Sequence, residues 1–300
     1  MSISVKHLTK YYGEQAAVND ISFEAKNGEI LGFLGPNGAG KSTTMKIITG
    51  FIPATNGLVE VCGMDVTKHP MEVRKRIGYL PEHNPLYLDM YVKEYLTFIG
   101  RIYKLDNLKD RVADVVSRVG LDKEQHKEIG ALSKGYRQRV GLAQAIIHDP
   151  EVLILDEPTS GLDPNQLDEI RGLIKDIGRK KTVMLSTHIM QEVEAICDRV
   201  IIIKNGNLVA NETAVNLQRH FDVQVVYVEF EGGVSKSQLS KIEFVSKVES
   251  INDNTFLIEA SHEIDMRRAI ANHAKDQNWL ILSLRQEEQS LEAVFKSLTK

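Results

Sequence analysis

The stretch ILGFLGPNGAGKSTTMKII, residues 30–48, decides the fold of this chain. Residues 30–34 are apolar and predict a buried strand, and a helical pattern begins at Ser42. Between them, the glycines and the small Ala39 leave room for backbone N–H groups to converge on an anion. The first turn of the helix adds unpaired N–H groups and the positive end of the helix dipole. The stretch therefore predicts an anion site at a strand-to-helix turn.

The loop matches the phosphate-binding pattern G-x-x-x-x-G-K-[ST], the P-loop, from Gly35 to Ser42. In this pattern the lysine, here Lys41, reaches the β- and γ-phosphates, and the hydroxyl of Ser42 binds Mg²⁺. The expected nucleotide-binding residues of the loop are Gly35, Pro36, Asn37, Gly38, Ala39, Gly40, Lys41, Ser42 and Thr43. A glycine-rich turn that binds nothing is the alternative, which the complete pattern between a strand and a helix disfavours.

The composition bounds the class of protein. The chain has 300 residues, 42% of them hydrophobic, which suits one large domain or two smaller ones. A net charge of −4 argues against a general nucleic-acid binder, so we expect no nucleic-acid partner. Cys62 and Cys197 are too few for a disulfide framework or a zinc site, which fits a reduced, cytoplasmic setting. We expect no signal peptide and no membrane span, so that any membrane role would come through a partner.

Apolar strands alternate with helical patterns through the first two thirds of the chain. This alternation predicts an α/β fold with a mainly parallel core sheet covered on both sides. The expected core strands after the P-loop are 77–80, 152–155, 182–186 and 200–203. A helical subdomain is expected at about 88–148, with a helical pattern over 92–119.

Polar groups follow three of these strands, where the ligand of a parallel sheet binds. They are the P-loop, the pair Asp156–Glu157 and His188. Asp156 can supply an oxygen ligand to Mg²⁺, and Glu157 is placed to polarise a water for attack on the γ-phosphate. Tyr12 lies upstream of the P-loop, where its ring can either stack on a purine base or pack at a sheet edge.

The chain changes character near residue 220. Residues 220–300 show the order βαββαβ, which predicts a small C-terminal α+β domain of the ferredoxin-like type. A last amphipathic helix is expected from Leu291, Val294, Phe295 and Leu298.

Three further motifs carry a family resemblance. The segment Leu-Ser-Lys-Gly-Tyr-Arg-Gln-Arg, residues 132–139, resembles the signature motif of ABC-transporter ATP-binding subunits. Residues 160–163, Ser-Gly-Leu-Asp, are similar to their D-loop, and residues 186–188, Ser-Thr-His, to their switch histidine. Together with the P-loop and the Asp156–Glu157 strand, these motifs identify residues 1–219 as a member of this family, and Tyr12 as its base-stacking aromatic.

The resemblance implies how the parts act. Two subunits would close head to tail on two Mg-ATP, and a separate transmembrane permease would dock near Glu82 and the helical subdomain. In the homodimer, Ser133, Lys134, Gly135 and Asp163 would serve the partner's site. Glu157, His188 and Lys41 would be catalytic, with His188 at the γ-phosphate, and Ser42, Glu82 and Asp156 would serve the Mg²⁺. The protein would be cytoplasmic, and peripheral at the inner membrane face through its permease.

Two positions depart from the family pattern. The family usually has glutamine where this chain has Glu82, and an ionised carboxylate can ligate Mg²⁺ but cannot donate a hydrogen bond. In the signature motif, Lys134 and Tyr136 replace the common glycine and glutamine, while Ser133 and Gly135 remain.

The C-terminal domain, ending with residues 290–295, is similar to the appendage of type-2 exporter ATPases, and the whole chain most resembles gliding-motility-associated ATP-binding subunits. The expected function is thus an ATPase that drives export. The alternatives are a soluble ABC ATPase of the translation or DNA-repair type, and a nucleotide-binding module without turnover. The single P-loop, the short span 44–132 and the presence of Glu157 and His188 disfavour them.

Overall fold

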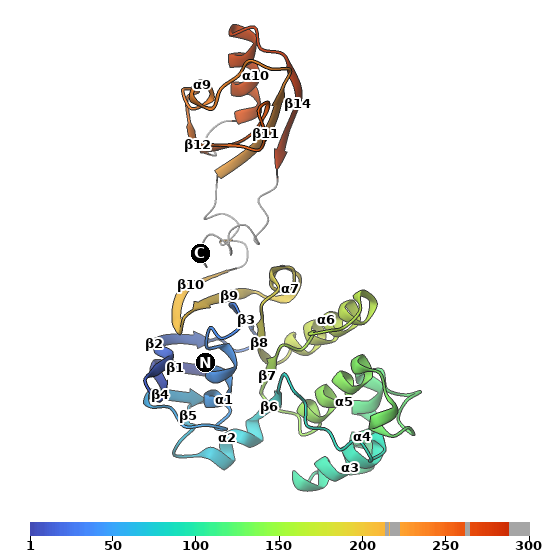
Figure 1. Ribbon diagram of the computed structural model, residues 1–300. Helices are drawn as coiled ribbons and strands as arrows, with labels where there is room; N and C mark the ends of the chain where they lie inside the picture. The colour runs from blue at the N-terminus through green and yellow to red at the C-terminus, as the bar shows by residue number, and fades with distance from the viewer. Residues whose placement is uncertain (214–215, 217–222, 262–264, 288–300) are drawn as a thin grey trace. The chain divides into compact units, whose positions relative to one another are not determined.

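The computed structural model describes residues 1–213, 216, 223–261 and 265–287. The chain divides into two compact units, Met1–Ala214 and Val215–Leu298 (Figure 1). Each unit has a hydrophobic core of its own. The predicted domain boundary at residues 219–220 lies outside the described residues.

A six-stranded sheet forms the centre of the first unit. Its strands, in spatial order, are β10 (Asn207–Thr213), β9 (Arg199–Lys204), β3 (Ile30–Leu34), β8 (Thr182–Thr187), β7 (Val152–Asp156) and β6 (Ile77–Leu80). Five of them are parallel, and β10 pairs antiparallel with β9. Every residue of β3, β7 and β8 is buried, as a sheet covered on both faces requires. The predicted mainly parallel sheet is confirmed.

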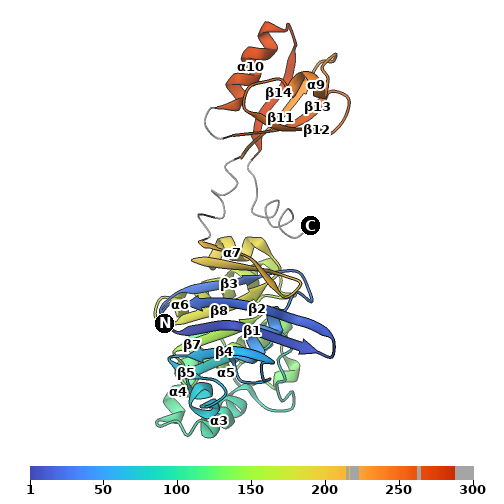
Figure 2. The same ribbon diagram turned by 90° about the vertical axis from the view of Figure 1, so that its left-hand side faces the viewer.

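A second, antiparallel sheet packs over the central one (Figure 2). Its strands are β2 (Gln15–Ala25), β1 (Ile3–Tyr12), β4 (Asn56–Val61) and β5 (Met64–Asp65). Helix α1 (Lys41–Ile48) shares one core with both sheets. Between the two sheets, the ring centroids of Phe23 and Phe33 lie 5.5 Å apart. Strands β1 and β2 stay paired up to the turn at Gly13, whose φ is +58°.

The expected helical subdomain is present, and its helices lie together in Figure 1. It consists of α3 (Val92–Ile102), α4 (Leu108–Arg118), the 3₁₀ turn η1 (Ile129–Ala131) and α5 (Lys134–Ile146). The helical pattern over 92–119 is therefore two helices. Lys104 and Asn107 have φ of +54° and +50°, a left-handed conformation that ends a right-handed helix.

Three other helices connect the strands of the central sheet. They are α2 (Pro70–Arg76), α6 (Pro164–Gly178) and α7 (Met190–Ile196). Helix α6 follows β7 and α7 follows β8, so the loops that open both helices lie at the carboxyl end of the sheet.

In its described residues, the second unit is a four-stranded antiparallel sheet with two helices. Its elements are β11 (Val223–Phe230), α9 (Lys236–Leu239), β12 (Val245–Ser250), β13 (Thr255–Ser261), α10 (Met266–Asp276) and β14 (Ile281–Glu287), in the sheet order β12-β13-β11-β14. This is the predicted βαββαβ order. The helix expected around Leu291 lies outside the described residues.

Within residues 1–213, 216, 223–261 and 265–287, none of the helices has the length and apolar character needed to cross a lipid bilayer.

Candidate nucleotide site

The P-loop joins β3 to α1, and its glycines are required by its geometry. Gly38 and Gly40 have φ of +77° and +109°, and a Cβ on Gly40 would lie 2.5 Å from the carbonyl oxygen of Ala17. Gly40 is the N-cap of α1, and no side chain caps this helix. The first N–H groups of α1 thus stay available to an anion at the loop.

Lys41 lies folded against the loop. Its Nζ donates hydrogen bonds to the carbonyls of Gly35 (2.8 Å) and Pro36 (3.2 Å), and lies 3.5 Å from Oε1 of Glu157. The side chain is buried, so its charge is compensated within the site. A bound phosphate would offer this ammonium group a stronger, charged acceptor than the two carbonyls.

The residues expected at the metal meet at the end of β7. Ser42 Oγ donates to Asp156 Oδ1 at 3.0 Å, and Ser186 Oγ donates to the same oxygen at 2.5 Å. Glu82 lines the same pocket as Ser42. Hydroxyl and carboxylate oxygens are the donors that a small divalent cation such as Mg²⁺ takes, so these residues fit it.

Glu157 and His188 form a hydrogen-bonded pair. His188 Nδ1 donates to Glu157 Oε2 at 2.9 Å, because a carboxylate can only accept, and this leaves Nε2 as the free ring nitrogen. Oε1 of Glu157 is buried without a hydrogen-bond partner among the described atoms. Burial raises the pKa of the Glu157 carboxyl above its usual range, against the lowering effects of Lys41 and His188. A carboxylate of raised basicity with one oxygen that accepts no hydrogen bond from the described residues is suited to take a proton from water.

Lys41, Ser42, Glu82 and Glu157 line a pocket of about 340 Å³, whereas Asp156 and His188 are connected to its walls by their hydrogen bonds to Ser42 and Glu157. It is lined by Ala17, Asn37, Gly38, Gly40, Lys41, Ser42, Thr43, Glu82 and Glu157. Sequence reasoning missed Ala17, a small residue on β2 with no motif of its own. Tyr12 is not part of this lining; it stands at the end of β1 with 51% of its surface exposed, and Lys10 Nζ lies 5.3 Å from its ring centre.

The signature and D-loop residues lie away from this pocket within one chain. Ser133 caps α5 by accepting from the N–H of Tyr136 (3.4 Å), and Asp163 caps α6 by accepting from the N–H of Gln166 (3.0 Å). Gly135 and Asp163 line a separate pocket of about 280 Å³. Lys134 lies over Gly161 of the D-loop, where a Cβ would meet its Nζ.

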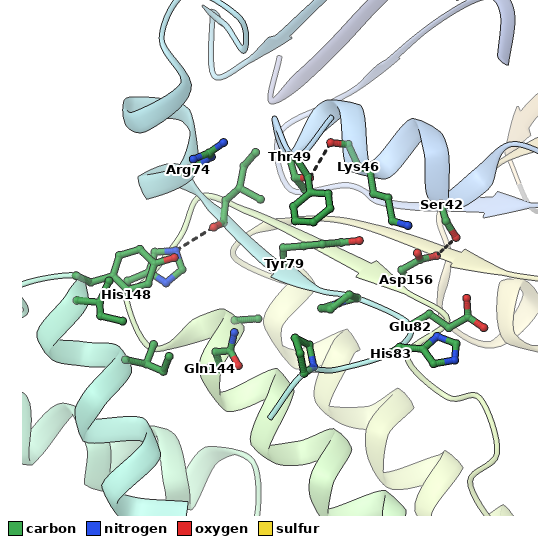
Figure 3. Close-up of a pocket in the computed structure, with 18 residues that line it drawn as sticks. Ser42, Lys46, Thr49, Arg74, Tyr79, Glu82, His83, Gln144, His148 and Asp156 are labelled. Carbon is green, nitrogen blue, oxygen red and sulfur yellow. Dashed lines mark hydrogen bonds between the residues drawn. The ribbon is translucent and has the colours of Figure 1, made fainter. Parts of the chain in front are cut away.

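A larger groove of about 630 Å³ has Ser42, Glu82 and Asp156 in its lining (Figure 3). Figure 3 shows Ser42, Asp156 and Glu82 at one end and Arg74 and His148 toward the other. Its apolar lining includes Phe51, Ile99, Ile102, Pro81 and Pro85, from both the core and the helical subdomain.

Two aromatic rings with buried polar atoms stand in this groove. The Tyr79 hydroxyl is buried without a partner among the described residues, and burial, with Asp156 and Glu82, raises its pKa. His148 stacks on Tyr103 with ring centres 3.9 Å apart, and its Nε2 donates to the carbonyl of Ile77 (3.0 Å). The sequence contained no signal for the position of Tyr79 or His148 in this groove, since the contacts of both rings depend on neighbours distant in the chain.

Comparison with known proteins agrees with this arrangement. Residues 18–160 match the family described as ABC transporter. The linearmycin resistance ATP-binding protein of Bacillus subtilis is 33% identical over 99% of this chain and 98% of its own length. The bacitracin transport ATP-binding protein of Bacillus licheniformis is 35% identical over 77% of this chain and 83% of its own length.

Solved structures show the same fold. An ATP-binding subunit of an ABC transporter superimposes with a TM-score of 0.67 and 30% identity, covering 74% of this chain and 93% of that one. A bacterial ABC transporter cassette, solved as a dimer, superimposes with a TM-score of 0.65 and 26% identity, covering 70% of this chain and 98% of that one.

Proposed function

From the premise that this chain belongs to the ABC transporter family as an ATP-binding subunit, we propose that it hydrolyses Mg-ATP as a head-to-tail homodimer and drives a separate permease in export. The observation that supports turnover is that Lys41 and Glu157 line one pocket, after β3 and β7, and that His188, after β8, is hydrogen-bonded to Glu157 as the second member of the Glu157–His188 pair. A module that only binds nucleotide would not need the last pair.

The residues divide the chemistry among them. Lys41 and the amides of the P-loop would hold the phosphates, and Tyr12 would stack on the base. Bound Mg²⁺, held by Ser42, Asp156 and Glu82, would neutralise charge on the β- and γ-phosphates. Glu157 would take the proton of the attacking water through Oε1, which accepts no hydrogen bond from the described residues, while His188 Nε2 is left for the γ-phosphate.

The second half of each site would come from the partner. Ser133, Lys134, Gly135 and Asp163 lie outside the P-loop pocket of their own chain, as residues that act across a dimer must. Lys134 and Gly135 stand in the first turn of α5, and the helix N-terminus and the positive charge of Lys134 both suit a phosphate.

The groove of Figure 3 is the proposed docking site for the permease. It joins the helical subdomain to Glu82 and Asp156, so a segment seated there would contact the walls of the metal site directly. The protein would thereby be held at the cytoplasmic face of the membrane.

Export is supported by the relatives, which are named for linearmycin resistance and bacitracin transport. A non-transport role in DNA repair would call for a long coiled coil between the P-loop and signature motif. The described helices between α1 and α5 have 7 to 11 residues each.

The resemblance to gliding-motility-associated subunits is a narrower hypothesis for the same activity. The relatives named above do not bear on it. Deletion of the gene, followed by a comparison of single-cell movement on agar with and without a complementing copy, would test it.

Nucleotide retention tests the central proposal. Purified full-length chain should bind a fluorescent ATP analogue with Mg²⁺, and Lys41→Ala should weaken binding by about 10-fold or more, because a buried charge-assisted contact is lost. Lys26→Ala, at an exposed lysine, is the matched control. No retention by the wild type, or equal affinity in Lys41→Ala, would overturn the proposal. A multi-span protein recovered with the tagged chain from detergent-solubilised membranes would identify the permease.

A further inference from the structure

Glu192 is a buried acidic residue that no step above uses. It lies in the first turn of α7, four residues after His188, and is 1% exposed. Burying a carboxyl group is costly unless its oxygens are bonded. No lysine, arginine or histidine forms an ion pair with it in the ranges that the structure describes.

Both of its oxygens accept hydrogen bonds from threonine hydroxyls instead. Thr159 Oγ1 donates to Oε1, and Thr187 Oγ1 donates to Oε2 at 2.5 Å. Both threonines are themselves buried. Hydrogen bonds to a carboxylate are stronger and more directional than those between neutral groups, so Glu192 binds the two hydroxyls at a defined separation.

The two threonines belong to the two loops that carry the catalytic pair. Thr159 stands two residues after Glu157, at the start of the D-loop segment, and Thr187 immediately precedes His188. These loops leave the neighbouring parallel strands β7 and β8. The carboxyl group of Glu192 thus joins the loop that carries Glu157 to the loop that carries His188.

We propose that Glu192 is a positioning residue, which keeps the Glu157 and His188 loops in the register that the Nδ1–Oε2 hydrogen bond needs. The proposal rests on the ATPase function proposed above. Displacement of a catalytic group by about 1 Å can cost on the order of 100-fold in rate, so a tie between these loops acts on turnover. Nucleotide binding, which depends on the P-loop, would be left nearly intact.

A purely structural role is the competing explanation, because an acidic residue in the first turn also stabilises α7. Such a role would change unfolding but not the turnover of folded protein. In that case the effects of substitutions at Glu192 and Thr159 would also be independent of each other. The two explanations therefore predict different kcat values for the single variants and a different combined effect on kcat in the double variant.

The test uses the full chain and four variants. Glu192→Ala should lower kcat by roughly 10- to 100-fold, and Thr159→Val, which removes one hydroxyl at nearly constant shape, by roughly 3- to 10-fold. Adding Thr159→Val to Glu192→Ala should lower kcat no further, because the hydrogen bond between Thr159 and Glu192 is already lost in Glu192→Ala. Glu192→Gln should stay within about 5-fold of the wild type, because its amide accepts from one hydroxyl and donates to the other.

Control measurements separate the explanations. The affinity for the fluorescent ATP analogue should stay within about 3-fold in every variant. Glu194→Gln, at an exposed acid on the same helix, should leave kcat unchanged. Circular dichroism confirms that each variant is folded, and if Glu192→Ala does not fold, Thr159→Val carries the test.

Three results would overturn the proposal while leaving the ATPase assignment intact. They are a wild-type kcat in folded Glu192→Ala, a wild-type kcat in Thr159→Val, or additive losses in the double variant. Inactivity of the wild type, or full activity of Lys41→Ala, would instead refute the proposed function itself.

Discussion

At the scale of single residues, Glu157 combines three properties that a general base needs. It is buried, its Oε1 has no hydrogen-bond partner among the described atoms, and the ion pair with Lys41 and the contact with His188 orient it from two sides. Its φ of +50° lies in the left-handed region, which non-glycine residues enter at an energetic cost. The backbone N–H of Glu157 donates to Ser186 Oγ (2.9 Å), which helps to hold this conformation.

Replacement of this carboxylate tests its role most directly. We expect Glu157→Gln to retain nucleotide and to lower turnover by roughly 10²–10⁴-fold, about 3–5 kcal/mol of barrier, because the amide cannot take a proton. Phosphate release under saturating Mg-ATP measures the change. Turnover equal to that of the wild type would remove Glu157 from this role.

The pH dependence of turnover follows from the same environment. As the proposed general base, Glu157 would act when deprotonated, and burial raises its pKa, so kcat should fall as the pH drops through that raised pKa. His188 lowers this pKa, and therefore His188→Ala should move the acidic limb to higher pH, besides lowering kcat. Profiles of kcat against pH for the two proteins give the comparison. A shift to lower pH would contradict the geometry.

At the scale of elements, helix α5 links the signature motif to both the D-loop and the groove. Gln138 Nε2 donates to the carbonyl of Pro158 (2.9 Å), next to Thr159. At the other end, His148 follows the helix, stacks on Tyr103 after α3 and bonds to the first residue of β6. The helical subdomain is therefore attached to the core at the strand that leads to Glu82.

His148 makes this attachment sensitive to acid. Burial lowers its pKa from 6.5 to about 4, so the folded chain holds the ring neutral while the unfolded chain protonates below pH 6.5. The stability it contributes is present above pH 6.5 and is lost as the pH falls toward 4. The loss at pH 5 is about 2 kcal/mol.

Urea unfolding at pH 7.5 and pH 5 measures this effect. In His148→Gln, the side chain can still donate to the Ile77 carbonyl but has no titrating group. We therefore expect its free energy of unfolding to fall by about 2 kcal/mol less than that of the wild type between pH 7.5 and pH 5. The other titrating groups are common to both proteins and cancel. Equal losses in the two proteins would show that His148 is not held neutral.

At the scale of the whole molecule, the proposed dimer would build each nucleotide site from two parts that lie on different chains. The P-loop pocket lacks the residues of α5 and α6 that line a second pocket. A symmetric pair in which each P-loop pocket meets the partner's α5 would complete both.

Dimerisation should therefore depend on nucleotide. Glu157→Gln with saturating Mg-ATP should elute from gel filtration as a dimer, since slow turnover preserves the closed state, and as a monomer without nucleotide. Ser133→Arg in the same background should stay monomeric, because its side chain would occupy the space of the partner's phosphate. A monomer under all conditions would count against the sandwich.

The second unit provides another test, because its separate core allows it to be removed. We propose that it stabilises the dimer or regulates turnover. A chain ending at Leu217 should keep nucleotide binding, but its dimerisation or kcat should change by about 3-fold or more. If neither the ATPase rate nor recovery of the membrane partner changes, the unit has no such role.

The sequence by itself determined the P-loop, the central parallel sheet and the acidic pair at the end of β7. These features depend on local conformation and on runs of buried apolar residues, which are written in contiguous stretches. The left-handed breaks at Lys104 and Asn107 carried no strong local signal, so one helical pattern became two helices.

Only the tertiary structure decided which residues outside the recognised motifs support the site. Ser186, Thr159 and Glu192 gain their roles because β8 lies beside β7, although the two strands are 25 residues apart in the chain. The groove exists because α3 and α5 face α1 and β6. Hydrogen bonds between such distant residues depend on how strands and helices pack, and no short stretch of sequence encodes that packing.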